Sequence, residues 1–211
     1  MTDTTIPPLT RNDAAVDFLL TRRSRPAKMI KGPGPDRAAL ETILTAAART
    51  PDHGALVPWR FIVLSKEALE TYAGALQAAG ERLGIEQSNI DKPATVYAQS
   101  PCAVVVVYSP KDAAKVPAIE QQYSAGAVCL SLVNAALATG WAASWVSGWH
   151  SHDPQFTAEQ LGVTADEKVA GIIHIGTEGM VPPERPRPDL DQDSLKEIAE
   201  DHFRVLTSTR L

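Results

Sequence analysis

The feature that most limits how this chain can fold is a long run of residues without charge. From Gln121 to His152 the sequence contains no Asp, Glu, Lys or Arg. Serines, Asn134 and Thr139 interrupt the run, so it never reaches about 18 consecutive apolar residues, the length that indicates a transmembrane helix. The run therefore predicts elements buried inside a globular protein, and we expect no contact with a membrane.

The first part of this run belongs to a predicted helix over residues 118–139, which is apolar or small on every face. At about 1.5 Å per residue, such a helix is roughly 33 Å long. A helix of this composition must be covered on all sides. A chain of 211 residues could cover it alone, but a partner subunit would do so more easily.

Capping and turn residues delimit the other elements. Asn12 and Asp36 stand where N-caps are expected before helical patterns. Residues 24–35 are predicted to form a loop, because three prolines and two glycines cannot continue a helix or join a central strand. Further helices are expected over 66–84, 89–99 and 153–162, and strands over 59–65, 102–109, 141–148 and 168–177.

These elements alternate without an internal repeat or a low-complexity linker. Four consecutive valines in the strand 102–109 are typical of a strand buried on both faces at the centre of a sheet. The pattern predicts one α+β domain over residues 12–211, preceded by a flexible tail over 1–11. A proline-rich arm and a last short helix are expected at the C-terminal end of the domain.

Composition narrows the functional classes. Hydrophobic residues make up 44% of the chain and charged residues 21%, which is typical of a globular protein. The formal net charge of −5, without a stripe of Lys and Arg, argues against a nucleic-acid partner. Cys102 and Cys129 lie in apolar segments, and the N-terminus lacks the features of a signal peptide, so the cytoplasm is the expected location.

The best candidate for a ligand site follows the first helix. Arg22, Arg23, Ser24 and Arg25 offer guanidinium groups and a hydroxyl on a loop, a combination suited to phosphate. In the alternative interpretation, Arg22 and Arg23 only complement the dipole at the C-terminal end of that helix. The sequence contains no common hydrolase, zinc-protease, P-loop or dinucleotide-binding motif.

Histidines and tryptophans give weaker signals. His53 lies in a Pro-Asp-His-Gly turn, and His150 and His152 form an H-x-H pair that could hold a metal with Asp153, although we interpret them as loop residues. Trp141, Trp145 and Trp149 recur every four residues and are predicted to share one face of an element, where core packing would be their ordinary role.

Several short motifs occur together in a specific order. RRS follows the first helix, ARTPDHGALVPWRFIVL comes next, the uncharged helix ends in ATGW, and SWVSG and IIHIGT follow. In this order they resemble the FMN-dependent nitroreductase family, in its compact bacterial subgroup. The resemblance covers roughly residues 12–190. It implies a three-layer α+β fold, with a central mixed or antiparallel sheet flanked by helices, and an intertwined homodimer with one FMN in each of two clefts between the subunits.

The resemblance also assigns site residues by position. Arg22, Arg23 and Ser24 match the ligands of the FMN phosphate and ribityl chain, and Arg49 and His53 match further polar contacts to the flavin. Trp145, Val146 and Ser147 match the strand segment that approaches FMN.

The subgroup often has Arg at the middle of that triplet. Val146 brings no cation there, so only backbone contacts carry over at this position. Arg185 or Arg187 could supply the missing charge near the phosphate, the alternative being a solvated, proline-rich arm.

By this resemblance, the chain is an NAD(P)H-dependent flavin oxidoreductase that works in two half-reactions. Electrons pass from NAD(P)H to FMN and then to a nitroaromatic, a quinone or a similar small acceptor, and no side chain is assigned as catalytic. Two alternatives stay open. The dimer could bind FMN without turnover, for storage or sensing, or it could use the fold to dehalogenate substrates or to fragment flavin.

Overall fold

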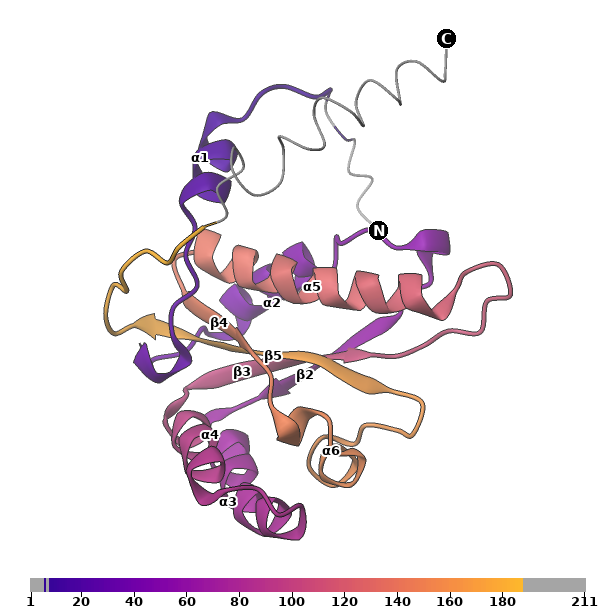
Figure 1. The fold of residues 1–211 in the computed structure, drawn as a ribbon. Coiled ribbons are helices and arrows are strands. Elements are labelled where there is room, and N and C mark those ends of the chain that lie inside the picture. Colours follow the sequence, from indigo (N-terminus) through magenta and orange to yellow (C-terminus); the bar gives the residue numbers. More distant parts are fainter. Residues whose placement is uncertain (1–5, 7, 188–211) are drawn as a thin grey trace, which may run out of the picture.

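A central sheet lies between two layers of helices (Figure 1). The computed structural model describes residues 6 and 8–187. One face of the sheet is covered by α2 (Arg37–Ala47) and α5 (Ala118–Ala138). The other face is covered by α3 (Lys66–Arg82), α4 (Gln87–Gln99) and α6 (Pro154–Leu161). The three-layer α+β architecture expected from the sequence is confirmed.

The sheet is antiparallel at every pairing between described strands. Its order is β1-β5-β3-β2, and β4 pairs with β5 as well. The strands are β1 (Ile30–Lys31), β2 (Trp59–Leu64), β3 (Cys102–Tyr108), β4 (Ala142–Val146) and β5 (Lys168–Glu178). All of β3 is buried, as the run of valines predicts.

The helix starts follow from their capping residues. The Asn12 side chain accepts a hydrogen bond from the Ala15 backbone N–H at 3.1 Å, which opens α1 (Asp13–Thr21). Asp36 caps α2 in the same way, with a bond of 2.8 Å from the Ala39 N–H. These bonds satisfy backbone donors that a helix start otherwise leaves without partners.

The predicted loop over 24–35 contains more structure than expected. A 3-10 turn over Ala27–Met29 leads into β1, where Ile30 is buried and pairs with Glu178 of β5. The prolines flank this two-residue strand and do not interrupt it, which is why a proline count failed to reveal it. The last helix expected at the C-terminus, and part of the tail over 1–11, lie outside the described residues.

The two faces of α5 differ in burial. Val128, Leu132 and Val133 face the sheet and are buried, whereas Tyr123 and Leu130 are 68% and 48% exposed. The described part of the chain therefore does not cover this helix on all sides. Among the described helices, none has both the length and the hydropathy needed to cross a membrane.

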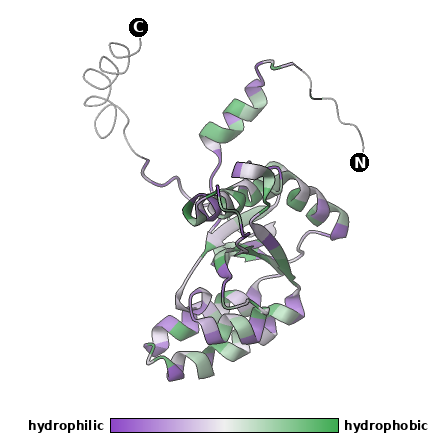
Figure 2. Ribbon diagram, turned by 90° about the vertical axis from the view of Figure 1, so that its right-hand side faces the viewer, coloured by the Kyte–Doolittle hydropathy of each residue, from purple (hydrophilic) through white to green (hydrophobic). Residues whose placement is uncertain are grey.

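Helix α1 stands away from the three layers (Figures 1 and 2). None of its residues is buried, although Val16, Leu19 and Leu20 are apolar and exposed. An amphipathic helix is normally stabilised by packing its apolar side against other parts of the protein. Here the described residues of the same chain do not provide that packing.

Candidate functional site

A group of arginines surrounds the segment that follows α1. The Arg22 Nη2 donates to Ser24 Oγ at 2.8 Å, and the Arg23 Nη1 donates to the Ser24 carbonyl at 2.7 Å. Arg187, far along the chain, donates from Nη2 to the Arg22 carbonyl at 3.4 Å. Of the two tail arginines considered from the sequence, Arg187 therefore reaches this group, while no side-chain bond of Arg185 is seen within the described residues.

Within this group Arg22 has no counter-ion. Arg25 pairs with Glu178, the Arg187 Nη2 lies 2.9 Å from a Glu184 oxygen, and the Arg23 Nε lies 3.9 Å from the same oxygen. No carboxylate of the described residues lies within 4.0 Å of the Arg22 guanidinium, and its buried Nε has no hydrogen-bond partner there. Burial, followed by the charges of Arg187, Arg23 and Arg25, lowers the pKa of Arg22, and the more distant Glu184 carboxylate offsets this only in part.

This arrangement separates the two interpretations of Arg22 and Arg23. Within the described residues, their guanidinium groups bond to Ser24 and not to carbonyls of α1. A buried donor without a partner, among several like charges, has the electrostatics of an anion site. The geometry thus favours binding of an anion such as phosphate over a simple helix-end contact.

Arg49 and His53 lie in the connection between α2 and β2. Arg49 is exposed, and His53 Nδ1 lies 2.6 Å from Glu120 Oε2 in the first turn of α5. The Asp52 carboxylate accepts from the backbone N–H groups of Leu56 and Val57, at 2.7 and 3.1 Å.

The backbone of this connection is strained. Val57 has a φ of 50°, in the left-handed region that β-branched residues avoid. Such a conformation costs on the order of 1–3 kcal/mol and is often found at functional sites. The Asp52 hydrogen bonds hold it in place.

The structure does not bring His53 together with the arginine group within this chain. Arg25 donates its backbone N–H to the Ala143 carbonyl at 2.9 Å, just beyond the C-terminal end of α5, whereas His53 lies at the N-terminal end of that helix. At about 1.5 Å per residue, the part of α5 from Glu120 to Ala138 spans roughly 27 Å. The two places therefore lie about the length of α5 apart within this chain.

Trp145, Val146 and Ser147 lie at the C-terminal end of β4, the strand in which Ala143 accepts the hydrogen bond from Arg25. Trp145 is 42% exposed and rests on the backbone of β5, where a Cβ at Gly171 would come within 2.0 Å of its Nε1. Val146 packs against the core beneath α3 and α4. Ser147 Oγ lies 3.0 Å from His152 Nε2.

Two residues that sequence reasoning missed lie beside Ser147. Asn89 and Lys92 of α4 line a cavity of about 350 Å³ together with Ser147 and Gly148. No carboxylate among the described residues pairs with Lys92 within 4.0 Å. No motif in the sequence pointed to these residues, because only the packing of α4 against the end of β4 places them there.

His150 and His152 do not act as a pair. His150 is buried, with Nδ1 3.0 Å from the Tyr72 hydroxyl, while His152 is exposed and bonds to Ser147. Both residues lie in the connection between β4 and α6, as their interpretation as loop residues implies, but the sequence did not indicate that His150 is buried. Burial lowers the pKa of His150 and of His174, which is also buried, to about 4. In the described part of the chain, no three potential metal-ligating side chains come together.

The three tryptophans do not share a face. Trp141 packs against the core beneath α2 and α5, Trp149 packs against the opposite core, and Trp145 stays partly exposed. The prediction was wrong because β4 ends at Val146. The alternation of side chains between the two faces of a strand therefore does not continue to Trp149.

Comparisons with known proteins agree on one family. Residues 22–177 match the family described as "Nitroreductase family". The chain is 32% identical, over 77% of its length, to 87% of "Putative NAD(P)H nitroreductase YdjA" from Escherichia coli K12. It is 34% identical, over 81% of its length, to 91% of a "Putative NAD(P)H nitroreductase" from Haemophilus influenzae.

Solved structures show the same fold. A nitroreductase-like family protein from Bacillus cereus superposes with a TM-score of 0.71 at 20% identity, covering 88% of this chain and 96% of that one. A nitroreductase with bound FMN from Bacteroides fragilis superposes with a TM-score of 0.66 at 20% identity, covering 82% and 94%.

Proposed function

Because this chain belongs to the nitroreductase family, we propose that it is an FMN-dependent oxidoreductase that passes electrons from NAD(P)H to small acceptors such as nitroaromatics and quinones. The observation that carries this proposal is the Arg22 guanidinium, half-buried among like charges and without a counter-ion in the described residues. FMN ends in a phosphate, and a phosphate would supply the missing negative charge.

The FMN phosphate and ribityl chain would be held by Arg22, Arg23 and Ser24, with Arg187 as a fourth contributor. Arg187 already approaches Arg22 through the Arg22 carbonyl. This supports the idea that the tail compensates for the cation missing at Val146. The hydrogen bond from Arg22 to Ser24 orients both side chains before the ligand arrives, which reduces the cost of ordering them on binding.

The isoalloxazine ring would lie against the end of β4. Trp145 offers an exposed apolar surface there, and Val146 and Ser147 offer backbone groups. Lys92 brings a positive charge to the cavity beside Ser147, where it would favour the anionic reduced flavin. When bound, FMN supplies the hydride chemistry, while the residues of the chain bind and orient it and exclude water.

The division of the site residues supports a homodimer. Arg49 and His53 would contact the flavin held by the partner's arginine group, because α5 keeps them far from the arginine group of their own chain. The exposed apolar residues Tyr123 and Leu130 of α5, and Leu19 of α1, are the surfaces that a partner would cover. The cytoplasmic location expected from the sequence stays a prediction.

Two measurements test the proposed function. Mass spectrometry of the cofactor released on denaturation should identify FMN, because the proposed ligands end at a phosphate. Steady-state oxidation of NADH and NADPH should then accelerate when a nitroaromatic or a quinone is added under anaerobic conditions. Release of FAD, or failure to bind FMN on reconstitution, would contradict the cofactor assignment.

The same assays separate the two alternatives. A protein that holds FMN but oxidises no NAD(P)H with any acceptor would be a binding or sensing protein. Halide release from a halogenated aromatic, or loss of the intact flavin during turnover, would point to the dehalogenating or flavin-fragmenting chemistry.

A further inference from the structure

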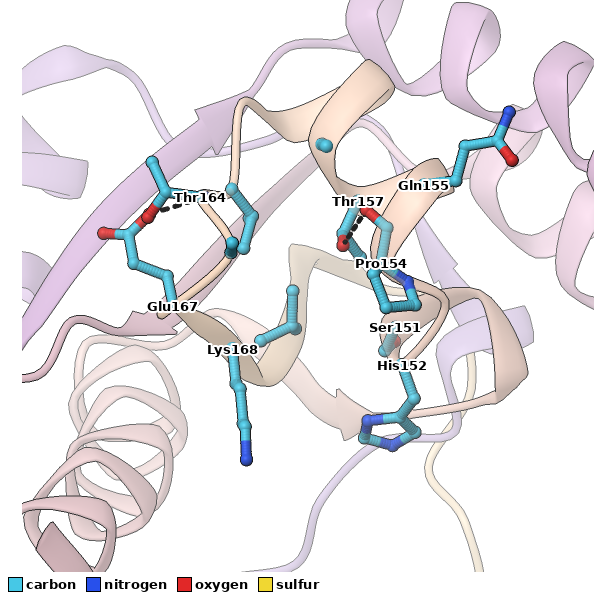
Figure 3. A pocket seen from close by; sticks show the side chains of 12 residues that line it. Ser151, His152, Pro154, Gln155, Thr157, Thr164, Glu167 and Lys168 are labelled. Carbon is cyan, nitrogen blue, oxygen red and sulfur yellow. Dashed lines mark hydrogen bonds between the residues drawn. The ribbon is translucent and has the colours of Figure 1, made fainter.

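A second cavity lies between α6 and the first residues of β5 (Figure 3). Its volume is about 710 Å³, and it contains none of the residues proposed to bind FMN. Helix α6 belongs to the layer of α3, α4 and α6, on the face of the sheet opposite α5 (Figure 1). Much of its wall is apolar, formed by Pro154, Ala158, Val163, Ala165 and Val169.

The acidic residue of the cavity is already neutralised. Arg60 donates to both oxygens of the Glu167 carboxylate, each at 2.7 Å, and the Thr164 N–H donates to it at 3.1 Å. The hydrogen bond from Arg60 lowers the pKa of Glu167 to about 2. Glu167 therefore fixes the loop between α6 and β5 and leaves no free negative charge in the cavity.

The remaining ionisable groups of the cavity are basic. Lys168 and His152 extend toward the same side of it in Figure 3. No carboxylate of the described residues lies within 4.0 Å of the Lys168 ammonium. His152 bonds through Nε2 to Ser147. The cavity thus combines an apolar wall with a cation that has no counter-ion.

From these features we propose that the cavity between α6 and β5 binds a small organic anion with an apolar ring, such as an aromatic carboxylate. The ring would lie against the apolar wall and the carboxylate would face Lys168. The volume lies within the range of roughly 300–1,000 Å³ that is usual for sites of small ligands. This site goes beyond the proposed function, since it lies outside the FMN site and does not require electron transfer.

Isothermal titration calorimetry with 2-naphthoate tests the proposal on the purified protein with its cofactor. We expect saturable binding of 2-naphthoate and at least ten-fold weaker binding of the neutral analogue 2-naphthamide. Lys168→Met should weaken binding of 2-naphthoate ten-fold or more, because it removes a charge-assisted hydrogen bond and keeps the apolar stem. Lys31→Met removes the same charge beside the far end of β5 and should leave the affinity unchanged.

A second variant tests the apolar wall. Ala158→Phe places a ring in the cavity from an exposed position on α6, so it should abolish binding and leave the thermal unfolding midpoint near that of wild type. Absence of binding to wild type, or unchanged affinity in both Lys168→Met and Ala158→Phe, would overturn the proposal. Flavin content measured on the same samples shows separately whether the proposed function fails.

Discussion

The two helical layers deal with their outer surfaces in different ways. The layer of α3, α4 and α6 presents polar groups to solvent, including an ion pair between Lys66 and Glu70 and a hydrogen bond from Gln155 to Glu159. The layer of α2 and α5 leaves Tyr123 and Leu130 exposed on its outer side. The first layer thus has an outer surface suited to contact with water, whereas the second has an outer surface suited to contact with protein.

The inner surfaces of the layers differ as well. Beneath α5 the core consists mostly of hydrocarbon side chains such as Ile43, Leu132 and Ile173, with Tyr108 and Cys129 among them. Beneath α3 and α4 it contains Tyr72 and Tyr97 in contact with the imidazole rings of His150 and His174. The layer with the polar outer surface therefore contains the buried histidines, and acid should affect that layer first.

The largest effect is expected for a charge on the inner face of α5. Val133→Glu places an unpaired carboxylate at a position that is only 2% exposed. It should lower the free energy of unfolding by about 3–5 kcal/mol, or prevent folding. Denaturant titration measures the loss, and a variant with wild-type stability would show that this face is not desolvated.

The same charge on the outer face of α5 should weaken association of the proposed homodimer. Leu130→Glu alters a residue that is 48% exposed in the single chain, so the stability of a protomer should change by only about 0.5 kcal/mol. The dimer should lose about 3 kcal/mol or more of association free energy, because the charge would be buried there. Sedimentation velocity at micromolar concentration measures the shift to monomer, with Glu86→Gln on the opposite layer as a control.

Acid should destabilise the layer that contains the buried histidines. In the folded protein the pKa of His150 and of His174 is lowered from 6.5 to about 4, so the unfolded chain takes up protons first as the pH falls. The histidine contribution to stability should be constant above about pH 7.5, fall by about 2 kcal/mol for each histidine on going to pH 5, and level off below pH 4, where carboxylates such as Glu167 begin to take up protons.

Denaturant unfolding at a series of pH values measures this slope. His150→Gln should remove about half of it, since one of two similar groups is lost. A slope that persists in full in His150→Gln would show that other groups control the acid sensitivity.

The smallest effects on folding stability are expected at the arginine group, where substitutions should act on ligand affinity. Arg22→Ala should weaken FMN binding by roughly 1.5–3 kcal/mol, or about ten- to a hundred-fold. Ser24→Ala removes a neutral hydroxyl and should cost on the order of 1 kcal/mol. Titration of apo-protein with FMN, followed by fluorescence quenching, measures both. An Arg22→Ala protein that binds FMN like wild type would reject the phosphate role.

Local patterns predicted most of the fold. The N-caps at Asn12 and Asp36 and the buried valine strand are set by neighbouring residues, and each was confirmed. The edge strand at Ile30 was not predicted, because a strand of two residues exists only through its pairing with the distant end of β5. The burial of His150 was not predicted for a similar reason, since it depends on contact with Tyr72 of α3, which is remote in sequence.

The candidate site was predictable in part. Arg22, Arg23 and Ser24 are adjacent in sequence, so a pattern could reveal them together. The approach of Arg187 to Arg22 and the position of Lys92 beside Ser147 depend on contacts between residues that are distant in sequence. No local sequence pattern specifies such contacts. The lack of charge in α5 indicated that other parts of the protein must pack around this helix. Composition could not show which side of α5 faces the sheet and which side stays exposed.

His53 and Arg22 of one chain are separated by the length of α5. Each proposed site would therefore take Arg22 from one subunit and His53 from the other. A homodimer of Arg22→Ala and a homodimer of His53→Ala would each have two damaged sites. In a mixed dimer, one site would contain both substitutions and the other site would contain neither. Co-expression of the two variants in equal amounts should therefore restore about one quarter of all sites to wild-type affinity. Such complementation would not occur if every flavin were bound within a single chain.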